Sequence, residues 1–529
     1  MRNTVLGAAG LISVLTLVSR AMGLVRKLAQ SWAMSDSPVA TAFDSANTVP
    51  NVLFEVAAGG ALAGAVIPIV SRFLAKKMAA ELNQTASALI TWILAVSLPL
   101  AALVALFADP IIGLVFDAKM APEVVRLSGT LLRMFALQIP LYGLSVVFSG
   151  ILQAHKKFVL PALAPLLSSL VVITVFAGYA VRVGPHISPQ ELTMGATLWL
   201  GWGTTAGVVA FSLPQLIPVL RLVKLRPTFR FPPGIGGLTL RLASAGLAAL
   251  AAQQLAILAI MYTANTLGNV GTYAAFNYAY AVFMVPYAVL AVPIATAVFP
   301  RISQAAQDET NPHLVQLVSV STRLVLAMGV LSAALLIVLA RPAQIVIQLG
   351  LPIEGLDVAL QAMAVGLIGF SLMYHGARVL YALDAGRLVI RTNTLAWGVV
   401  VLCLIGARVF HISGRVPTLM AIGLAISVGL SIGAAATIWA ISSRLGRDSI
   451  RGYGRLFTVL LAAVSAASIL AWLVVHRVLT SFGGGILAAL LAALLGAIII
   501  VGVGGYTLWR VDRVALLAVA GKERNAEDA

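Results

Sequence analysis

The stretch Ala63-Gly-Ala-Val-Ile-Pro68-Ile-Val-Ser71 returns later in the chain as Ala295-Thr-Ala-Val-Phe-Pro300-Arg-Ile-Ser303. Both copies fit the pattern A-x-A-V-x-P-x-[V/I]-S, and the second begins 232 residues after the first. A further pair of apolar stretches, ending near Leu152-Gln-Ala154 and Leu380-Tyr-Ala382, has a similar offset. The alternative is a chance recurrence of an apolar helix end with one proline. Two matches at nearly equal offset favour a duplication, which predicts a chain built from two related halves.

The composition places these halves in a membrane. Hydrophobic residues make up 60% of the 529 residues and charged residues only 10%, whereas a soluble domain carries about 25% charged residues. So few charges cannot cover a water-facing surface, and a bilayer is the solvent that fits. The net charge of +17 comes from basic residues at the ends of apolar stretches. These residues suit membrane orientation and anionic lipid headgroups, and no basic stripe with interleaved aromatics predicts nucleic-acid binding.

About fourteen apolar stretches are long enough to cross the hydrocarbon, which takes roughly 20 residues. We therefore predict an all-α polytopic membrane protein. The first stretch follows only Arg2 and has no small-residue cleavage site after it, so we expect a retained helix rather than a signal peptide. The predicted spans are 4–32, 39–74, 84–108, 123–154, 159–183, 191–222, 237–266, 270–304, 312–340, 354–382, 388–411, 416–443, 452–476 and 484–510.

The repeat predicts how these helices are grouped. Both members of each matching pair are expected to run in the same direction, so the repeat is parallel, and helices 1–6 match helices 7–12. Parallel repeats are typical of alternating-access transporters that bind substrate between two lobes. The last two helices fall outside the repeat. The predicted division is 1–226 for the N-lobe, 227–236 for a cytoplasmic linker, 237–447 for the C-lobe, 448–512 for the two extra helices and 513–529 for a cytoplasmic tail.

Basic residues are distributed unevenly between alternate loops. The even-numbered loops and the tail carry Arg72, Lys76, Lys77, Lys156, Lys157, Arg221, Lys224, Arg226, Arg230, Arg301, Arg387, Arg391, Arg444, Arg447, Arg451, Arg510, Arg513, Lys522 and Arg524. The odd-numbered loops hold only Lys119, Arg182, Arg341, Arg408, Arg415 and Arg477. Because cytoplasmic loops carry the excess of Lys and Arg, both termini are predicted to be cytoplasmic.

Charged residues inside the first two spans are candidates for a functional site. A charge at mid-bilayer costs roughly 2.5–3.5 kcal/mol even on the most permissive scale. Arg20 and Arg26 lie about 120° and about 9 Å apart on one helix, so both can border one cavity, and two guanidiniums suit a diphosphate. On the next helix Asp44 and Glu55 share a face, and Asp44 is the nearest expected counter-ion for either arginine. The alternative for Arg26 and Lys27 is that they extend to the headgroups and bind nothing.

No motif predicts catalysis. The sequence has no G-x-x-x-x-G-K-[ST] and no H-E-x-x-H, so we expect no P-loop and no zinc-protease site. Its six histidines are scattered, and its single cysteine excludes a disulfide framework and a cysteine-based metal site. We therefore predict no enzyme activity, metal or cofactor. His375 and Arg378, one turn apart in the tenth span, are weaker cavity candidates, because a lone histidine in a span is more often packed or hydrogen-bonded.

Several motifs resemble those of the MurJ (MviN) family. The segment Ser19-Arg20-Ala-Met-Gly23-Leu-Val-Arg26 is similar to the family's S-R-x-x-G-x-x-R opening. Ala42-Phe43-Asp44 and Val49-Pro50-Asn51 resemble its D-A-F and L-P-N elements. Further similar segments are Gly60–Pro68, Gly150–Pro165 and Arg378–Asp384. Their order and spacing extend over the whole chain, which is identified as a member, most like actinobacterial ones.

The resemblance implies a function. MurJ proteins belong to the MOP exporter superfamily and move lipid II, an undecaprenyl-diphosphate-linked peptidoglycan precursor, from the inner to the outer leaflet. A flippase working by alternating access in the bacterial cytoplasmic membrane is therefore expected, with helices 13 and 14 forming a groove for the lipid tail. Expected partners are lipid II, membrane lipids and cell-wall synthesis or division proteins. The candidate substrate-binding residues are Arg20, Arg26, Asp44, Asn51 and Glu55.

The sequence also departs from the family. Phe54-Glu55 stands where many members carry Arg-Arg, and Ala281 stands where an arginine is usual, so a clamp of three or four arginines is not expected. The predicted helices 7, 11 and 12 contain no Asp or Glu, which argues against a sodium site.

Three alternatives remain open. Another MOP transporter, either a polysaccharide-lipid flippase or a drug exporter, shares the repeat but typically stops at twelve helices. A membrane enzyme acting on lipid-linked sugars would need paired carboxylates and large loops. A scaffold that only recruits division proteins would gain nothing from Arg20 and Asp44 in lipid.

Overall fold

The computed structural model describes residues 2–56, 63–185, 187–307, 312–349 and 351–513. Regular secondary structure in this part of the chain consists of helices. The chain divides into two units, Met1–Ala274 and Ala275–Ala529. The predicted tail lies outside the described residues from residue 514 onward, as does the 57–62 portion of the predicted second span.

The first unit contains the helices up to α11, and α12 crosses into the second unit. Their bounds are α1 (Arg2–Met34), α2 (Pro38–Glu55), α3 (Ala63–Ala75), α4 (Ala79–Leu106), α5 (Ala108–Gly113), α6 (Pro122–Phe135), α7 (Gln138–Ala154), α8 (Val159–Arg182), α9 (Met194–Ser212), η2 (Leu213–Gln215), α10 (Leu216–Leu222), α11 (Ile235–Leu267) and α12 (Thr272–Pro286).

The second unit continues from α12 to the end of the described chain. Its elements are η3 (Tyr287–Ala291), α13 (Val292–Ala305), α14 (Pro312–Gln348), α15 (Leu356–Ala364), α16 (Gly366–Ala382), α17 (Gly386–Val409), α18 (Arg415–Leu445), η4 (Arg447–Ile450), α19 (Tyr453–Ser481) and α20 (Ile486–Val511). The predicted N-lobe ended at residue 226, whereas the first unit also includes α11. The predicted division itself rests on the sequence repeat and stays a prediction.

The helices fall within the predicted apolar stretches. Eleven described helices are long and apolar enough to cross a membrane, or twelve if the bent pair α15 and α16 counts as one span. An all-α polytopic membrane fold is therefore confirmed, while the predicted total of fourteen crossings stays a prediction. Several spans are interrupted: α15 and α16 meet at 51°, and the π-helical turn η3 follows Pro286, because proline lacks the donor that a regular helix needs.

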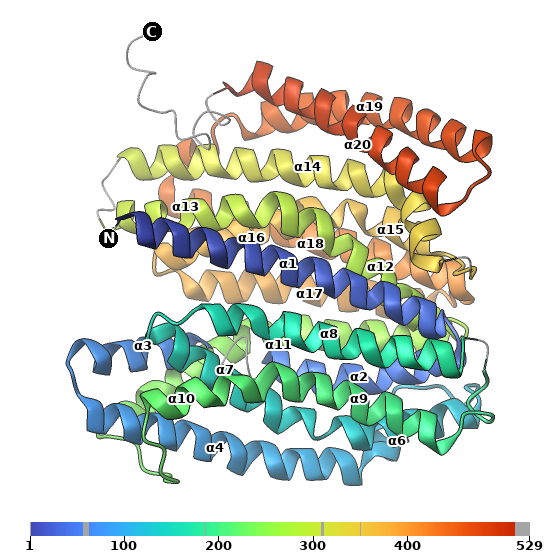
Figure 1. The fold of residues 1–529 in the computed structure, drawn as a ribbon. Helices are drawn as coiled ribbons and strands as arrows, with labels where there is room; N and C mark the ends of the chain where they lie inside the picture. The colour runs from blue at the N-terminus through green and yellow to red at the C-terminus, as the bar shows by residue number, and fades with distance from the viewer. Residues whose placement is uncertain (1, 57–62, 186, 308–311, 350, 514–529) are drawn as a thin grey trace. The chain divides into compact units, whose positions relative to one another are not determined.

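In the first unit, α1 lies along α8, α8 packs on α9, and α2 packs on α6 (Figure 1). A buried apolar cluster joins α3, α4 and α7 with the end of α10. It is formed by Val66, Ile69, Val70, Phe73, Leu82, Ala86, Leu89, Val147, Phe148, Ile151, Leu152, Val219, Val223 and Ile235. Burial of such side chains stabilises the fold by roughly 1.5–3 kcal/mol each.

In the second unit, α17 and α16 pack on α18, and the pair α19 and α20 lies along α14 (Figure 1). The corresponding buried cluster contains Ile302, Leu314, Val318, Val379, Leu380, Leu383, Ala385, Val389, Ala440 and Ile441. The two clusters show the offsets found in the sequence. Val70, Leu82 and Ala86 precede Ile302, Leu314 and Val318 by 232 residues, and Ile151 and Leu152 precede Val379 and Leu380 by 228.

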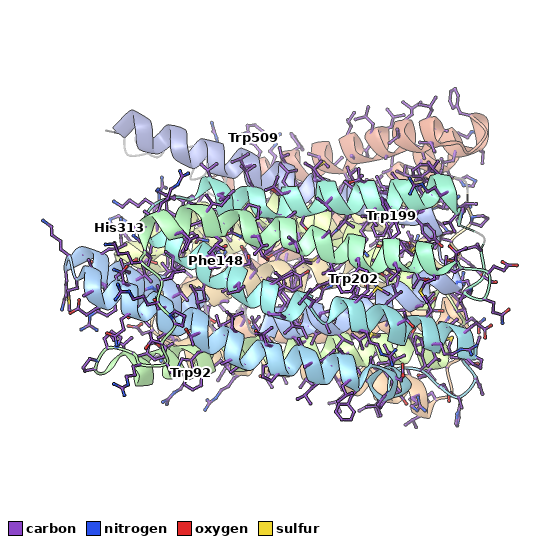
Figure 2. The ribbon with its side chains drawn as sticks, turned by 60° about the horizontal axis from the view of Figure 1, so that its bottom comes forward. Trp92, Phe148, Trp199, Trp202, His313 and Trp509 are labelled. Atoms are coloured by element: carbon purple, nitrogen blue, oxygen red, sulfur yellow. The ribbon has the colours of Figure 1, made fainter. Side chains whose placement is uncertain are left out.

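Large aromatic side chains occupy both the interior and the outer surface. Phe148 is 2% exposed, whereas Trp92 on α4 and Trp202 on α9 are 45% and 48% exposed (Figure 2). Trp199, also on α9, carries the guanidinium of Arg182 5.2 Å from its ring centroid. Half-exposed tryptophans beside a basic residue are typical of a membrane-water interface.

The close crossing of α16 and α18 gives a stability prediction. A Cβ at Gly369 would overlap the backbone carbonyl of Leu430, whereas a Cβ at Gly398 on α17 would meet nothing within 4 Å. We expect Gly369→Ala to lower the free energy of unfolding by about 1–3 kcal/mol, the usual cost of overpacking. Thermal unfolding of the purified protein in detergent measures this change. Gly398→Ala is the matched control, and equal stability of the two variants would contradict the close crossing.

Candidate functional site

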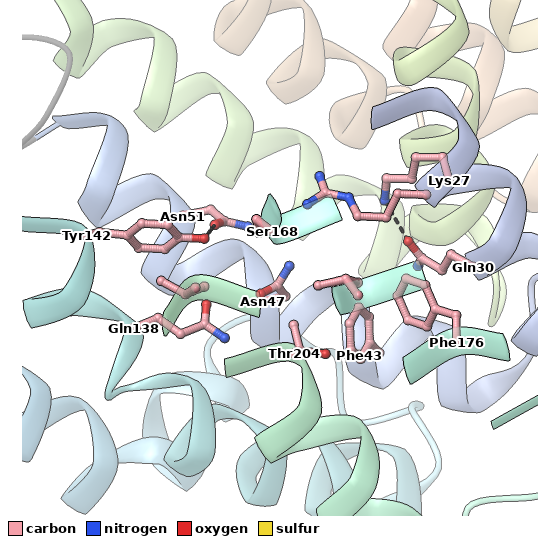
Figure 3. A pocket seen from close by; sticks show the side chains of 13 residues that line it. Lys27, Gln30, Phe43, Asn47, Asn51, Gln138, Tyr142, Ser168, Phe176 and Thr204 are labelled. Carbon is pink, nitrogen blue, oxygen red and sulfur yellow. Dashed lines mark hydrogen bonds between the residues drawn. The ribbon is translucent and has the colours of Figure 1, made fainter. Parts of the chain in front are cut away.

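A polar cavity of about 100 Å³ lies inside the first unit (Figure 3). Lys27 and Gln30 lie at one end, Tyr142 and Asn51 at the other, and Asn47 between them (Figure 3). The lining side chains come from α1, α2, α7, α8 and α9. They are Arg26, Lys27, Gln30, Phe43, Asn47, Asn51, Gln138, Tyr142, Ser168, Val172, Phe176, Thr204 and Val208.

The helical repeat explains why these residues meet. Side chains four positions apart lie on the same face of an α-helix, and each wall of the cavity is built from such pairs. The local sequence also fixes where α2 begins, because the Ser37 hydroxyl accepts a hydrogen bond from the Ala40 amide and Pro38 occupies the first turn. The pairs are Arg26 with Gln30, Asn47 with Asn51, Gln138 with Tyr142, Ser168 with Val172 and Thr204 with Val208.

A buried polar network forms the wall at the Lys27 end. The Gln30 side-chain amide donates to Asp44 Oδ1 at 2.9 Å and accepts from Lys27 Nζ at 2.9 Å. Lys27 Nζ also lies 3.6 Å from Asp44 Oδ1. Asp44 is 4% exposed and its Oδ2 has no hydrogen-bond partner in the described part of the chain. A buried carboxylate needs such a pairing, so Lys27 and Gln30 hold its charge inside the unit.

Aromatic packing sets the opposite end of the cavity. The Tyr142 hydroxyl donates to Asn51 Oδ1 at 3.2 Å. The Tyr142 ring also stacks on Phe54, with 4.2 Å between centroids and 26° between the ring planes. These contacts fix Asn51 with its oxygen toward Tyr142, and its amide NH₂ remains able to donate to a ligand.

Arg26 is the cation that this arrangement leaves in excess. It lines the cavity and is partly buried, and within the described residues no hydrogen bond or ion pair to it occurs. Asp44 neutralises Lys27, so the lining keeps a net positive charge from Arg26. A guanidinium beside amide and hydroxyl donors suits the oxygens of a phosphate. The cavity volume, about three times the roughly 30 Å³ share of one liquid water, matches a group of phosphate size.

The structure separates the predicted site residues into two groups. Arg26 and Asn51 line the cavity, and Asp44 lies directly behind it. The side chains of Arg20 and Glu55 are exposed and do not line it. The expected pairing of Asp44 with Arg20 or Arg26 is wrong, because its ion pair is with Lys27. The roles of all five in substrate binding stay predictions.

The weaker candidates lie in the second unit. His375 on α16 is 1% exposed, and its Nε2 lies 3.2 Å from the Ser321 hydroxyl of α14. The Arg378 guanidinium stacks over the Tyr374 ring at 3.6 Å from its centroid. Both side chains are therefore engaged within their own unit. Among the described residues, no group of three or more His, Cys, Asp or Glu side chains is placed to hold a metal ion.

Long apolar helices around a small cationic cavity define a helical membrane transporter. The same fold occurs in a solved structure described as the inward-facing conformation of a multidrug resistance MATE family transporter of the MOP superfamily. That structure has a TM-score of 0.65 and 15% identity, covering 82% of this chain and 98% of that one.

Within this class the chain belongs to the lipid II flippase family MurJ, whose model matches residues 31–493. The lipid II flippase MurJ of Burkholderia cenocepacia is 27% identical over 437 residues, which is 79% of this chain and 80% of the relative. A probable lipid II flippase MurJ of Synechocystis is 30% identical over 232 residues, and this alignment spans only 43% of either protein. A solved lipid II flippase MurJ in an inward closed conformation has a TM-score of 0.73 and 20% identity, covering 94% of this chain and 99% of that one.

Proposed function

We propose that this protein moves lipid II from the inner to the outer leaflet of the bacterial cytoplasmic membrane by alternating access. Membership of the lipid II flippase family supports the substrate class. This is a transport function, in which binding and release replace bond chemistry. Lipid II and membrane lipids are the proposed ligands, and cell-wall synthesis or division proteins are the proposed partners.

The observation that carries the proposal is the placement of Arg26. A cation inside a membrane-spanning bundle is costly unless a partner or water compensates its charge, and Arg26 borders a cavity with no ion-pair partner among the described residues. A phosphate of the lipid II diphosphate provides the missing anion. The cavity accommodates one such group, so the sugar and peptide portions of lipid II are expected to bind outside it.

Two further residues complete the proposed substrate path. Arg20 lies six residues before Arg26 on α1 and has an exposed side chain, which makes it a candidate for the second phosphate or for an earlier binding step. Glu55, also exposed, ends α2. We propose that Asn51 donates to a phosphate oxygen, while Asp44 holds Lys27 until an anion enters.

The proposed architecture is two related lobes followed by an accessory helix pair. The equal offsets within the two buried clusters support the duplication. The helices α19 and α20 lie outside the repeat and expose much apolar surface, including Ile469 at 65% and Leu487 at 85%. Such a surface suits the undecaprenyl chain, and we propose that it forms the lipid-tail groove.

The proposed orientation places both termini in the cytoplasm, as the distribution of basic loops predicts. We expect a reporter that works only in the cytoplasm to give signal when it is fused after Ala529. A reporter that works only outside the cytoplasm is expected to give signal when it is fused in the 183–193 loop. The opposite pattern of signals would contradict the orientation.

Complementation tests the transport function. The native flippase of a test bacterium is depleted, this gene is supplied, and the accessibility of lipid II at the outer surface is measured. Restored growth together with restored accessibility is the expected result. The alternative of another MOP-type transporter predicts normal membrane insertion with no lipid II at the outer surface.

A further inference from the structure

An extended segment between α10 and α11 lies along the beginning of α4. Backbone N–H groups at every second position of this segment donate to side chains at every fourth position of α4. Alternation by two fits an extended chain and spacing by four fits one face of a helix, so the two elements match in register. We call residues 224–230 the linker strap. The pairs are Lys224 with Asn83 Oδ1 at 2.9 Å, Arg226 with Ser87 Oγ at 3.0 Å and Thr228 with Thr91 Oγ1 at 3.2 Å.

Phe229 forms the tip of the strap. The indole nitrogen of Trp92 donates to the Phe229 carbonyl at 3.0 Å, and the two rings meet edge to face at 5.3 Å and 81°. The chain then turns back, because the Gln84 amide donates to the Arg230 carbonyl at 3.0 Å. Figure 2 shows Trp92 on α4 at this position. The strap therefore runs along α4 to Trp92 and returns toward the start of the helix.

The tip lies where α4 changes from polar to apolar. The first turns of α4 contain Glu81, Asn83 and Gln84, and an almost wholly apolar run follows over residues 88–106. That run is about 28 Å long, close to the roughly 30 Å thickness of the hydrocarbon. Trp92 is one turn inside the run, so Phe229 and Trp92 lie at the boundary between headgroups and hydrocarbon, where aromatic residues gather.

The outer surface of the strap is both basic and aromatic. Phe229 is 57% exposed and Trp92 45% exposed. The side chains of Lys224, Arg226 and Arg230 are also exposed. Within the described chain, none of these three cations takes part in an ion pair. An aromatic tip flanked by two arginines thus faces the surroundings without a protein partner to neutralise the arginines.

We propose that the linker strap is a binding site for anionic phospholipid headgroups at the membrane face where α4 begins. Basic residues next to a membrane span attract anionic lipids, while Phe229 and Trp92 contact the upper acyl region of the same lipid. A soluble anion would satisfy the arginines and leave both aromatic rings exposed, so a lipid fits the whole surface better. The hydrogen bonds from α4 fix the strap before binding, which reduces the entropy lost when the lipid is held.

Quenching of Trp92 fluorescence provides a local test. The full-length protein is reconstituted in phosphatidylcholine vesicles that contain a minor fraction of either bromine-labelled phosphatidylglycerol or bromine-labelled phosphatidylcholine. The signal of Trp92 is the difference between the wild-type protein and Trp92→Phe. We expect stronger quenching by the anionic lipid, and we expect this preference to fall about fivefold for each arginine lost in Arg226→Gln and Arg230→Gln.

Two further variants separate the strap from a general charge effect. The control Arg444→Gln/Arg447→Gln removes the same charge from another exposed loop and is expected to keep the preference. Ser87→Ala/Thr91→Val keeps all the arginines but removes two acceptors of the strap, and is expected to weaken the preference. The proposal is overturned if the wild type shows no preference, if the strap arginines make no difference, if the acceptor variant behaves as wild type, or if added inorganic phosphate abolishes the preference. Thermal unfolding of each variant verifies that it is folded.

Discussion

Replacing Arg26 with alanine is expected to abolish lipid II transport while the protein remains in the membrane at its normal level. Arg26 is the cavity cation without an ion-pair partner among the described residues, so its loss removes the charge-assisted hydrogen bonds proposed for a phosphate. Such bonds contribute about 1.5–3 kcal/mol, which corresponds to a roughly 10- to 100-fold weaker interaction. Arg26→Lys keeps the charge and loses the two-pronged fork, and is expected to be impaired to a smaller extent.

Growth after depletion of a native flippase, together with the amount of protein in the membrane, measures the effect. Arg182→Ala is the matched control, because Arg182 is exposed and rests on Trp199 outside the cavity. Arg20→Ala is also expected to abolish transport if Arg20 contacts the substrate as proposed. If Arg20→Ala and Arg26→Ala both sustain growth at normal expression, the cationic-cavity mechanism is wrong even though the family membership stands.

Removing Arg323 is expected to destabilise the second unit by about 3–5 kcal/mol, the usual cost of leaving one partner of a buried ion pair alone. Arg323 Nε lies 2.5 Å from Asp512 Oδ2, and the two side chains are only 15% and 11% exposed. The same guanidinium donates to the Ser319 hydroxyl at 2.9 Å and to the Arg451 carbonyl at 2.8 Å. Arg323 therefore fastens the end of α20 and the start of α19 to α14.

Thermal unfolding in detergent of Arg323→Ala, compared with Arg133→Ala, tests this role. Arg133 also pairs with an aspartate, Asp109, but those side chains are 43% and 62% exposed, so its loss is expected to cost only about 0–1 kcal/mol. The double variant Arg323→Met/Asp512→Leu is expected to recover stability, since no buried charge is left alone. Equal destabilisation by the two alanine variants would contradict the importance of burial.

Hydropathy predicted the helices well where membrane and helix end together, and less well elsewhere. The predicted span 84–108 is α4, which begins five residues earlier at Ala79, because Glu81 and Asn83 extend the helix beyond the apolar run. The predicted span 312–340 continues as α14 to Gln348, through Arg341 and Pro342. A helix ends where its hydrogen bonding ends, whereas hydropathy reports where the lipid ends. The bend between α15 and α16 depends on packing that composition does not encode.

The site was predicted only as far as charge indicated it. Arg26 lines the cavity as a mid-span charge should, but Gln30, Asn47 and Gln138 were missed, because a neutral amide hardly lowers the hydropathy of a span. Their signal was present as polar residues four positions apart, which places two on one helix face. The partner of Asp44 was wrong because Lys27, one residue beyond Arg26, is rotated by about 100° around α1. Which faces of separate helices meet is settled by packing alone.

The offset between the two buried clusters implies that gene duplication was followed by a division of labour. Val49-Pro50-Asn51 has a counterpart in Val285-Pro286-Tyr287, and Tyr142 corresponds to Phe370 at the offset that relates Leu152 to Leu380. In one copy Asn51 and Tyr142 form a hydrogen bond at 3.2 Å beside the cavity. In the other, the rings of Tyr287 and Phe370 pack with 4.7 Å between their centroids. The ancestral half-protein thus gave rise to one descendant that keeps polar chemistry and another whose equivalent position became solid aromatic core.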